Sequence, residues 1–287
     1  MRPVLQKNKL SYKLWIVYAI ILLICIVGIA LALSNTQYFK EENVGRALGI
    51  VNQDSEKEDE YNELKSDFNT IFTNQVDNLQ TENINIKKIN TDYDIIVTAF
   101  NREKEEENCS INASIPYINI DDSLIRQFNK HLNQGYKEKA ERLMNQISSM
   151  NIIYSVEYKA YIQNNILSLV IRSEYKEGDK SQKVELETFN YNLAEKREIT
   201  IDEILILKNI TQEYATNKIR NEIKKIQEQN QPLINEGYPF YERDYNADRY
   251  DISNSKYFLY GKDGMLYVIY PYGNEDDTSE MDIVIFQ

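Results

Sequence analysis

Residues 14–33 form one uninterrupted apolar run, LWIVYAIILLICIVGIALAL, that contains no charged side chain. A helix of this length spans roughly 30 Å at about 1.5 Å per residue, which is the thickness of a bilayer core. A helix that is apolar on every side suits lipid better than the half-wet surface of a small domain. The run therefore predicts a transmembrane helix at 14–33, with the bulk of the chain folded outside the bilayer.

The charges on either side of this run predict its orientation. The segment 1–13 carries four basic residues and no acid, whereas Glu41 and Glu42 follow the run. Positive charge is retained on the cytoplasmic side. The sequence thus predicts a single-pass protein of the cell membrane, with a short cytoplasmic tail at 1–13 and an extracytoplasmic C-terminal domain.

A cleaved signal peptide is the alternative reading of the same segment. Ala30-Leu31-Ala32 has the small-residue spacing that signal peptidase accepts, with cleavage after Ala32. The apolar run is longer than the usual signal-peptide core of about 7–15 residues. Membrane anchoring is therefore the preferred interpretation, and cleavage stays open.

The part of the chain beyond residue 33 is strongly acidic. The whole chain has 33 basic and 45 acidic residues, and the four basic residues at the N-terminus leave 29 against 45, a balance of -16. Such a surface repels nucleic acid and attracts cationic partners. The charge argues against a nucleic-acid partner and favours a cationic protein, and the alternative is that it serves only solubility.

The residues needed for common catalytic sites are scarce. His131 is the one histidine, Cys25 lies in the apolar run and Cys109 stands alone, so the sequence predicts no metal site and no disulfide. No phosphate-binding, dinucleotide-binding or nucleophile-elbow motif is present, which predicts a non-enzyme without a cofactor. A cell-wall glycan hydrolase remains the alternative, because that chemistry needs only two suitably spaced acids.

The outer part divides into three segments. Residues 34–60 are mostly polar and predict a stalk, and residues 61–90 show apolar positions spaced by three and four, which predicts an amphipathic helical segment. Residues 91–287 predict an α+β domain with a mainly antiparallel sheet and two main helices. Its expected strands are 94–101, 110–119, 152–162, 166–173, 183–193, 256–260, 265–270 and 281–286, with helices starting near 121–123 and at about 211–229.

The loop 238–251, YPFYERDYNADRYD, is the most unusual stretch of this domain. Tyr and Arg are enriched at interface hot spots, and acidic side chains steer a basic partner. The candidate partner-binding residues are Tyr238, Tyr241, Arg243, Asp244, Tyr245, Asp248, Tyr250, Asp276 and Asp277. Packing of the rings over a sheet edge is the alternative. The D-x-N-x-D spacing from Asp244 resembles a calcium loop but lacks its later Gly and Glu.

The order of segments from about residue 110 to 287 resembles a known family. SIPYINI leads into a long helix, IQNNILSLVIRSEY leads to ETFNYNLAEKREITIDEIL, and the chain ends FLYGKDGMLYVIYPYG…MDIVIF. This order is similar to the extracytoplasmic domain shared by RsiV-type anti-sigma receptors and PdaC-type peptidoglycan deacetylases. The resemblance implies a ligand-binding module, which in the receptor members binds lysozyme.

The sequence departs from both kinds of member. Thirteen cytoplasmic residues are too few to hold a sigma factor, and no deacetylase domain follows Gln287. We therefore expect a membrane-anchored binding or sensing domain for a lysozyme-like protein or a peptidoglycan fragment. An accessory subunit of an envelope complex is a further alternative.

Overall fold

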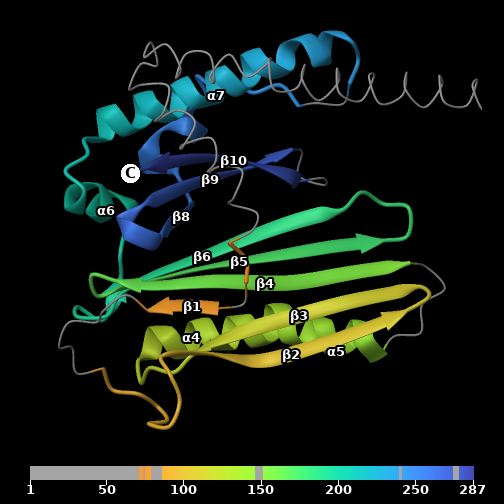
Figure 1. Ribbon diagram of the computed structural model, residues 1–287, viewed down its shortest axis with the longest axis vertical. Coiled ribbons are helices and arrows are strands. Elements are labelled where there is room, and N and C mark those ends of the chain that lie inside the picture. The colour runs from red at the N-terminus through yellow and green to blue at the C-terminus, as the bar shows by residue number, and fades with distance from the viewer. Residues whose placement is uncertain (1–70, 74, 79–85, 146–150, 239–240, 274–277) are drawn as a thin grey trace, which may run out of the picture. The chain divides into compact units, whose positions relative to one another are not determined.

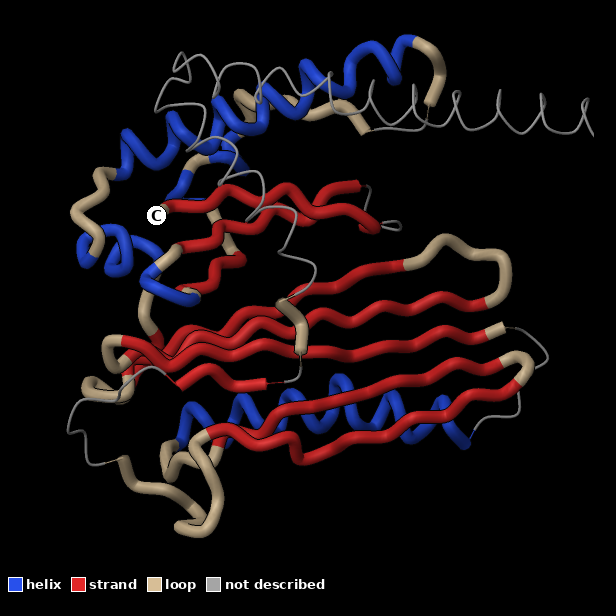
Figure 2. The backbone as a smooth tube through the Cα atoms, viewed as in Figure 1, coloured by secondary structure: helices blue, strands red, loops and turns tan. Residues whose placement is uncertain are grey.

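The computed structural model describes residues 71–73, 75–78, 86–145, 151–238, 241–273 and 278–287. Two sheets organise this part of the chain (Figure 1; Figure 2). The larger, sheet A, has the order β2–β3–β4–β5–β6–β7, with all neighbours antiparallel except β3 and β4. Its strands are β2 (Ile96–Glu106), β3 (Cys109–Ile118), β4 (Ile152–Gln163), β5 (Ile166–Glu177), β6 (Lys183–Asn192) and β7 (Arg197–Glu198).

Tight turns between the long strands follow from local residue chemistry. Asn164 and Asn165, which join β4 to β5, have φ values of 50° and 64°. Asn tolerates this left-handed region better than other residues with a side chain, and two such residues in succession match the twist of a hairpin. The two asparagines therefore favour the turn, and it sets the register in which Gln163 pairs with Ile166.

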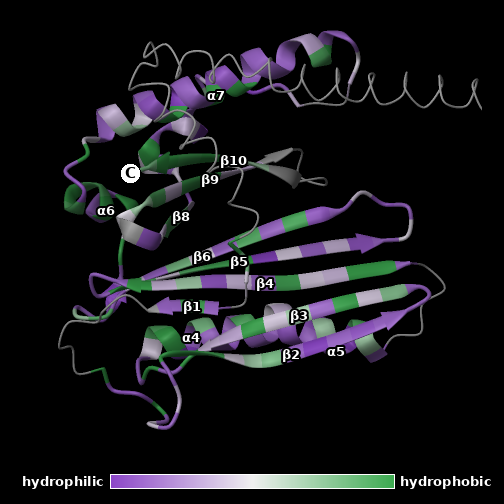
Figure 3. Cartoon of the chain, viewed as in Figure 1, coloured by the Kyte–Doolittle hydropathy of each residue, from purple (hydrophilic) through white to green (hydrophobic). Residues whose placement is uncertain are grey.

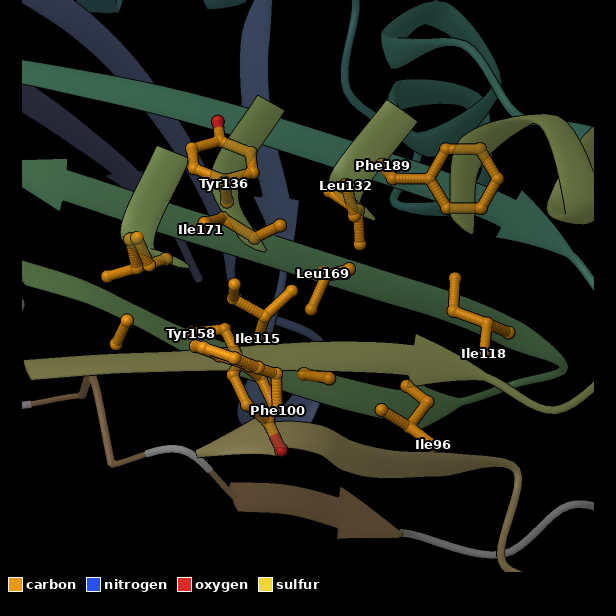
Figure 4. Close-up of a cluster of buried hydrophobic side chains, with 14 of the residues drawn as sticks. Ile96, Phe100, Ile115, Ile118, Leu132, Tyr136, Tyr158, Leu169, Ile171 and Phe189 are labelled. Carbon is orange, nitrogen blue, oxygen red and sulfur yellow. The ribbon is translucent and has the colours of Figure 1, made fainter. Parts of the chain in front are cut away.

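One face of sheet A is covered by helices. These are α4 (Ser123–Leu132), the π-helical turn η2 (Asn133–Lys137) and α5 (Glu138–Asn145). Asp122 caps α4 by accepting hydrogen bonds from the amides of Leu124 and Ile125. Alternate strand residues and the helical stripe, among them Ile118, Leu132, Leu169 and Phe189, form the first core (Figure 4). The banding of hydropathy along the strands is visible in Figure 3.

A second region completes the domain. It contains the helices α6 (Ile201–Leu207) and α7 (Gln212–Asn235), and sheet B of β8 (Tyr257–Tyr260), β9 (Leu266–Gly273) and β10 (Thr278–Phe286). Short 3-10 turns lie at η3 (Asp248–Tyr250), η4 (Ile252–Asn254) and η5 (Lys262–Gly264). The second core packs Ile219 and Ile223 of α7 against Leu266, Val268 and Val284 of sheet B.

Buried polar side chains join the two sheets. Asn190 on β6 donates from Nδ2 to the Phe258 carbonyl at 3.0 Å, and the Tyr260 amide donates to Oγ of Ser168 on β5 at 2.9 Å. Ser168 in turn donates to Oδ1 of Asn190. These bonds satisfy backbone groups on the outer edge of β8, an edge that would otherwise need another strand or water.

The prediction of a helical segment at 61–90 is wrong where the structure describes it. Gln75–Asn78 form strand β1, which pairs in parallel with Lys159–Ile162 of β4. The Lys159 side chain is only 7% exposed and lies 3.0 Å from the Asp77 carboxylate. Pairing with an open strand edge has overridden the helical periodicity. Residues 61–70, 74 and 79–85 lie outside the described residues.

The remaining predictions for the fold have a mixed outcome. The α+β class with a mainly antiparallel sheet is confirmed, although α6 is a further helix and α7 continues past Pro232 to Asn235. Within the described ranges, no helix has the length and apolarity to cross a membrane. The predicted tail 1–13, transmembrane helix 14–33 and stalk 34–60 lie outside those ranges.

Candidate recognition surface

A buried ion pair fastens the loop 238–251 to sheet B. Arg243 donates from Nε and one terminal nitrogen to the two carboxylate oxygens of Asp282, at 2.8 and 3.0 Å. The two side chains are 3% and 4% exposed. The Arg243 amide also donates to Oε1 of Gln227 on α7 at 2.7 Å. A bidentate pair of this kind holds the loop against both β10 and α7.

Two further arginines hold the second half of the loop. Arg220 on α7 lies 2.6 Å from the Asp251 carboxylate, and Arg249 donates to the Pro271 carbonyl on β9 at 2.7 Å. Between these contacts the ring of Tyr250 packs edge-on against Tyr270, with centroids 5.1 Å apart. Burial raises the pKa of both phenols above the ordinary value, because a phenolate would be poorly solvated there.

This anchoring corrects two of the candidate partner-binding residues. Arg243 and Tyr250 are buried, at 6% and 2% exposure, so neither side chain is presented to a partner. Arg243 neutralises Asp282, the one carboxylate that is buried in the described part of the chain. Tyr250 belongs to the second core. For these two residues the alternative of packing over the sheet holds, because an isolated buried charge or phenol needs a partner inside the protein.

Other candidates remain on the surface. Tyr238 is 55% exposed and Tyr241 is 36% exposed, and Asp244 and Asp248 are also exposed. Tyr245 is half-buried against the second core, with the ammonium of Lys224 5.8 Å from its ring centroid. Glu242 is exposed as well, so the loop offers two exposed rings and three exposed carboxylates on an anchored backbone.

Asp276 and Asp277 lie outside the described residues. The strands that lead to them are described, and they contact the loop: Arg249 binds Pro271 on β9, and Arg243 binds Asp282 on β10. Pro271 pairs with Met281, and Tyr270 pairs with Asp282. The loop therefore contacts both β9 and β10.

The calcium-like spacing at Asp244 forms a local turn. Oδ1 of Asp244 accepts a hydrogen bond from the Asn246 amide at 3.0 Å, as in an Asx turn. Among the described residues no group of three or more His, Cys, Asp or Glu side chains converges to hold a metal ion.

A second polar cluster was not predicted from the sequence. Nε2 of His131 lies 3.0 Å from the Glu187 carboxylate on β6, and Tyr136 donates to the same carboxylate at 2.8 Å. Burial and the nearby Glu187 charge raise the pKa of Tyr136. Glu187 is 56 residues from His131 in the chain, so only the pairing of helix and sheet brings them together. The π-helical turn η2 places Tyr136 on the sheet side.

Comparison with known proteins gives a likeness of backbone only. No family model matches the chain, and no curated protein matches it. Two of the solved structures that resemble it are DUF3298 family proteins. One, from Pseudomonas aeruginosa PAO1, has 10% identity and a TM-score of 0.37, with 66% of this chain and 88% of that chain covered. Another, from Bacteroides fragilis NCTC 9343, has 13% identity and a TM-score of 0.35, covering 67% and 89%.

Proposed function

We propose that the domain is a membrane-anchored, extracytoplasmic binding module that recognises a cationic protein through the loop 238–251. The observation that carries this proposal is that Tyr238, Tyr241, Asp244 and Asp248 are all exposed within one loop that a buried ion pair at Arg243 holds in place. Anchoring matters because a loop that is already ordered loses less entropy on binding.

The two kinds of exposed side chain have different roles in this proposal. Carboxylates on an acidic domain attract a basic partner and raise the association rate. Exposed aromatic rings then supply the desolvated contacts that slow dissociation, at about 2 kcal/mol or more for a true hot spot. The resemblance to the RsiV-type and PdaC-type extracytoplasmic domain favours a lysozyme-like protein as this partner, with a peptidoglycan fragment as the alternative ligand.

Binding kinetics with lysozyme test the proposal. Tyr241→Ala should speed dissociation at least tenfold with little change in association, whereas Asp244→Asn with Asp248→Asn should slow association and flatten its salt dependence. The matched control is Tyr93→Ala, since Tyr93 is 57% exposed and lies outside the loop. Unaltered dissociation in Tyr241→Ala, or an equal effect in Tyr93→Ala, would show that the loop does not contact the partner.

Membrane anchoring is tested separately. The proposed topology places 1–13 in the cytoplasm and the domain outside. Protease added to intact protoplasts should digest the domain and leave a tag at the N-terminus protected. Protection of the domain would reverse the orientation, and release of an untagged domain into the medium would show cleavage after Ala32 instead.

A further inference from the structure

A cavity beside sheet B has a charge opposite to that of the rest of the domain. It has a volume of about 310 Å³ and lies between the 3-10 turns that precede β8 and the end of β9. Its charged lining residues are Arg249 and Lys256, with no acid among the residues that line it. In a chain with 45 acidic and 33 basic residues, two cations around one cavity form a local positive site on an acidic surface.

The cations of this cavity are not neutralised by the described residues. Arg249 uses one terminal nitrogen for the Pro271 carbonyl, and its guanidinium carbon lies 5.2 Å from the Tyr250 ring centroid. Neither Arg249 nor Lys256 forms an ion pair with any acid in the described ranges. Asp251, the acid between them in the chain, is paired with Arg220. The remaining guanidinium donors and the Lys256 ammonium are therefore available to an anion.

The walls of the cavity are largely apolar. The half-buried rings of Tyr257 and Pro271 form most of them, whereas Ile269, at 1% exposure, adds almost no accessible surface. Tyr270 also lines the cavity, and its hydroxyl is already bonded to Ser255 at 2.6 Å, so this phenol contributes its ring. Asn254 donates to the Asp248 carbonyl at 2.8 Å and so fixes one side. Small-molecule sites usually have apolar walls with a few placed polar groups. Their volumes are roughly 300–1,000 Å³, so this cavity is a small one.

We infer that this cavity binds a small carboxylate with a compact apolar body, of the kind found at the C-terminus of a peptide. Arg249 and Lys256 hold the carboxylate by charge-assisted hydrogen bonds, and the half-buried rings of Tyr257 and Pro271 receive the apolar part. Arg249 is held by its bond to Pro271, so its guanidinium is oriented before the ligand arrives. Arg249 belongs to the loop 238–251, so this site adjoins the proposed protein-binding surface, but its deciding residue, Lys256, lies outside that loop and its probe is a small carboxylate, so the two proposals can fail separately.

Ligand-observed NMR on the full chain in detergent tests the inference. N-acetyl-leucine is the probe, and N-acetyl-leucinamide is the matched ligand without the negative charge. The carboxylate should bind in the millimolar range and at least tenfold more tightly than the amide. Inorganic phosphate should compete at least tenfold less well than N-acetyl-leucine, because it cannot fill the apolar walls.

Two variants locate the site. Lys256→Gln should weaken N-acetyl-leucine binding at least fivefold, because it removes one of the two positive charges. The variant should still fold, since Lys256 is exposed. Lys262→Gln, an exposed lysine at the other end of β8, is the control and should leave binding unchanged. Arg249→Gln keeps a donor for Pro271 but should also weaken binding, and if it fails to fold, Lys256→Gln decides. Equal binding of acid and amide, or equal losses in Lys256→Gln and Lys262→Gln, would overturn the inference.

Discussion

The two cores of this domain are held together in different ways. The first core is built mainly from alternate residues of long strands and from one helical stripe, so its contacts repeat along regular elements. The second core takes Tyr250 and Ile252 from short turns, and individual polar contacts hold it: Arg243 with Asp282, and Asn190 with Phe258. A missing apolar contact leaves a cavity, whereas a missing partner in one of these polar pairs leaves a buried charge or polar group unsatisfied. We therefore expect the loss of one buried polar partner to destabilise the second region selectively.

The largest effect is expected at the buried ion pair. Arg243→Ala should lower the free energy of unfolding by about 3–5 kcal/mol, because it leaves Asp282 charged and unpaired at 4% exposure. Denaturant unfolding measures this loss, and hydrogen exchange should show it in sheet B and α7 before sheet A.

The control for this prediction is Arg126→Ala in the first region. Arg126 pairs with Asp121 at the surface, where its side chain is 55% exposed, so the cost should be below about 1 kcal/mol. Replacing both Arg243 and Asp282 by apolar residues of similar size should recover most of the stability. Equal losses of unfolding free energy in Arg243→Ala and Arg126→Ala would show that the buried ion pair is no more important than a surface pair.

A smaller effect is expected at the junction of the two sheets. Asn190→Ala removes the donor to the Phe258 carbonyl and the acceptor of Ser168, which should cost about 2 kcal/mol because buried polar groups lose their partners. Amide exchange at Tyr260 should speed up, since its acceptor Ser168 is no longer held. Thr188→Ala, two residues earlier on β6, is the matched control. If its exchange pattern equals that of Asn190→Ala, the polar junction does not hold sheet B in place.

The smallest effect concerns the start of α6. Glu203 forms a capping box with Thr200 and accepts a hydrogen bond from Arg197 at 3.0 Å. The Arg197 guanidinium first, and then the Thr200 amide, lower the pKa of the Glu203 carboxyl to about 2.

The lowered pKa of Glu203 makes the free energy of unfolding depend on pH in a known direction. The contribution of Glu203 is complete above the unfolded pKa of about 4.3 and is lost as the pH falls through about 2. Glu203→Gln should cost only a few tenths of a kcal/mol at pH 7, because the pair is partly exposed. The difference from the parent should vanish towards pH 2 in urea unfolding. A difference that is constant from pH 7 to pH 2 would show that the carboxylate charge plays no part.

Local chemistry in the sequence was sufficient for much of the fold. The Asn164-Asn165 turn, the Asp122 cap and the Thr200 cap each depend on residues within a few positions of one another, and all three are present. The alternation in the first halves of β4 and β6 likewise reflects burial of one face, which a period of two reveals, whereas Ile166–Ile171 of β5 are buried at every position. For this reason the α+β class and most strand positions of 91–287 could be predicted.

Contacts between distant segments could not be predicted in this way. The apolar spacing around Val76 indicated a helix, yet an open edge of β4 made a strand of Gln75–Asn78. The same limit applied to the candidate site: nothing near Arg243 in the chain identifies Asp282 as its partner, 39 positions away, and so an apparent surface arginine is part of the interior.

The sequence by itself determined the turns, the caps, the periodicity of burial and the acidic balance, because each is a property of neighbouring residues or of composition. Only the tertiary structure decided which loop residues face solvent, that His131 meets Glu187, and that two cations gather around one cavity in an acidic chain. The physical reason is that pairing and burial depend on which surfaces meet after folding, and the free energy of a buried polar group is set by the partner that it finds there.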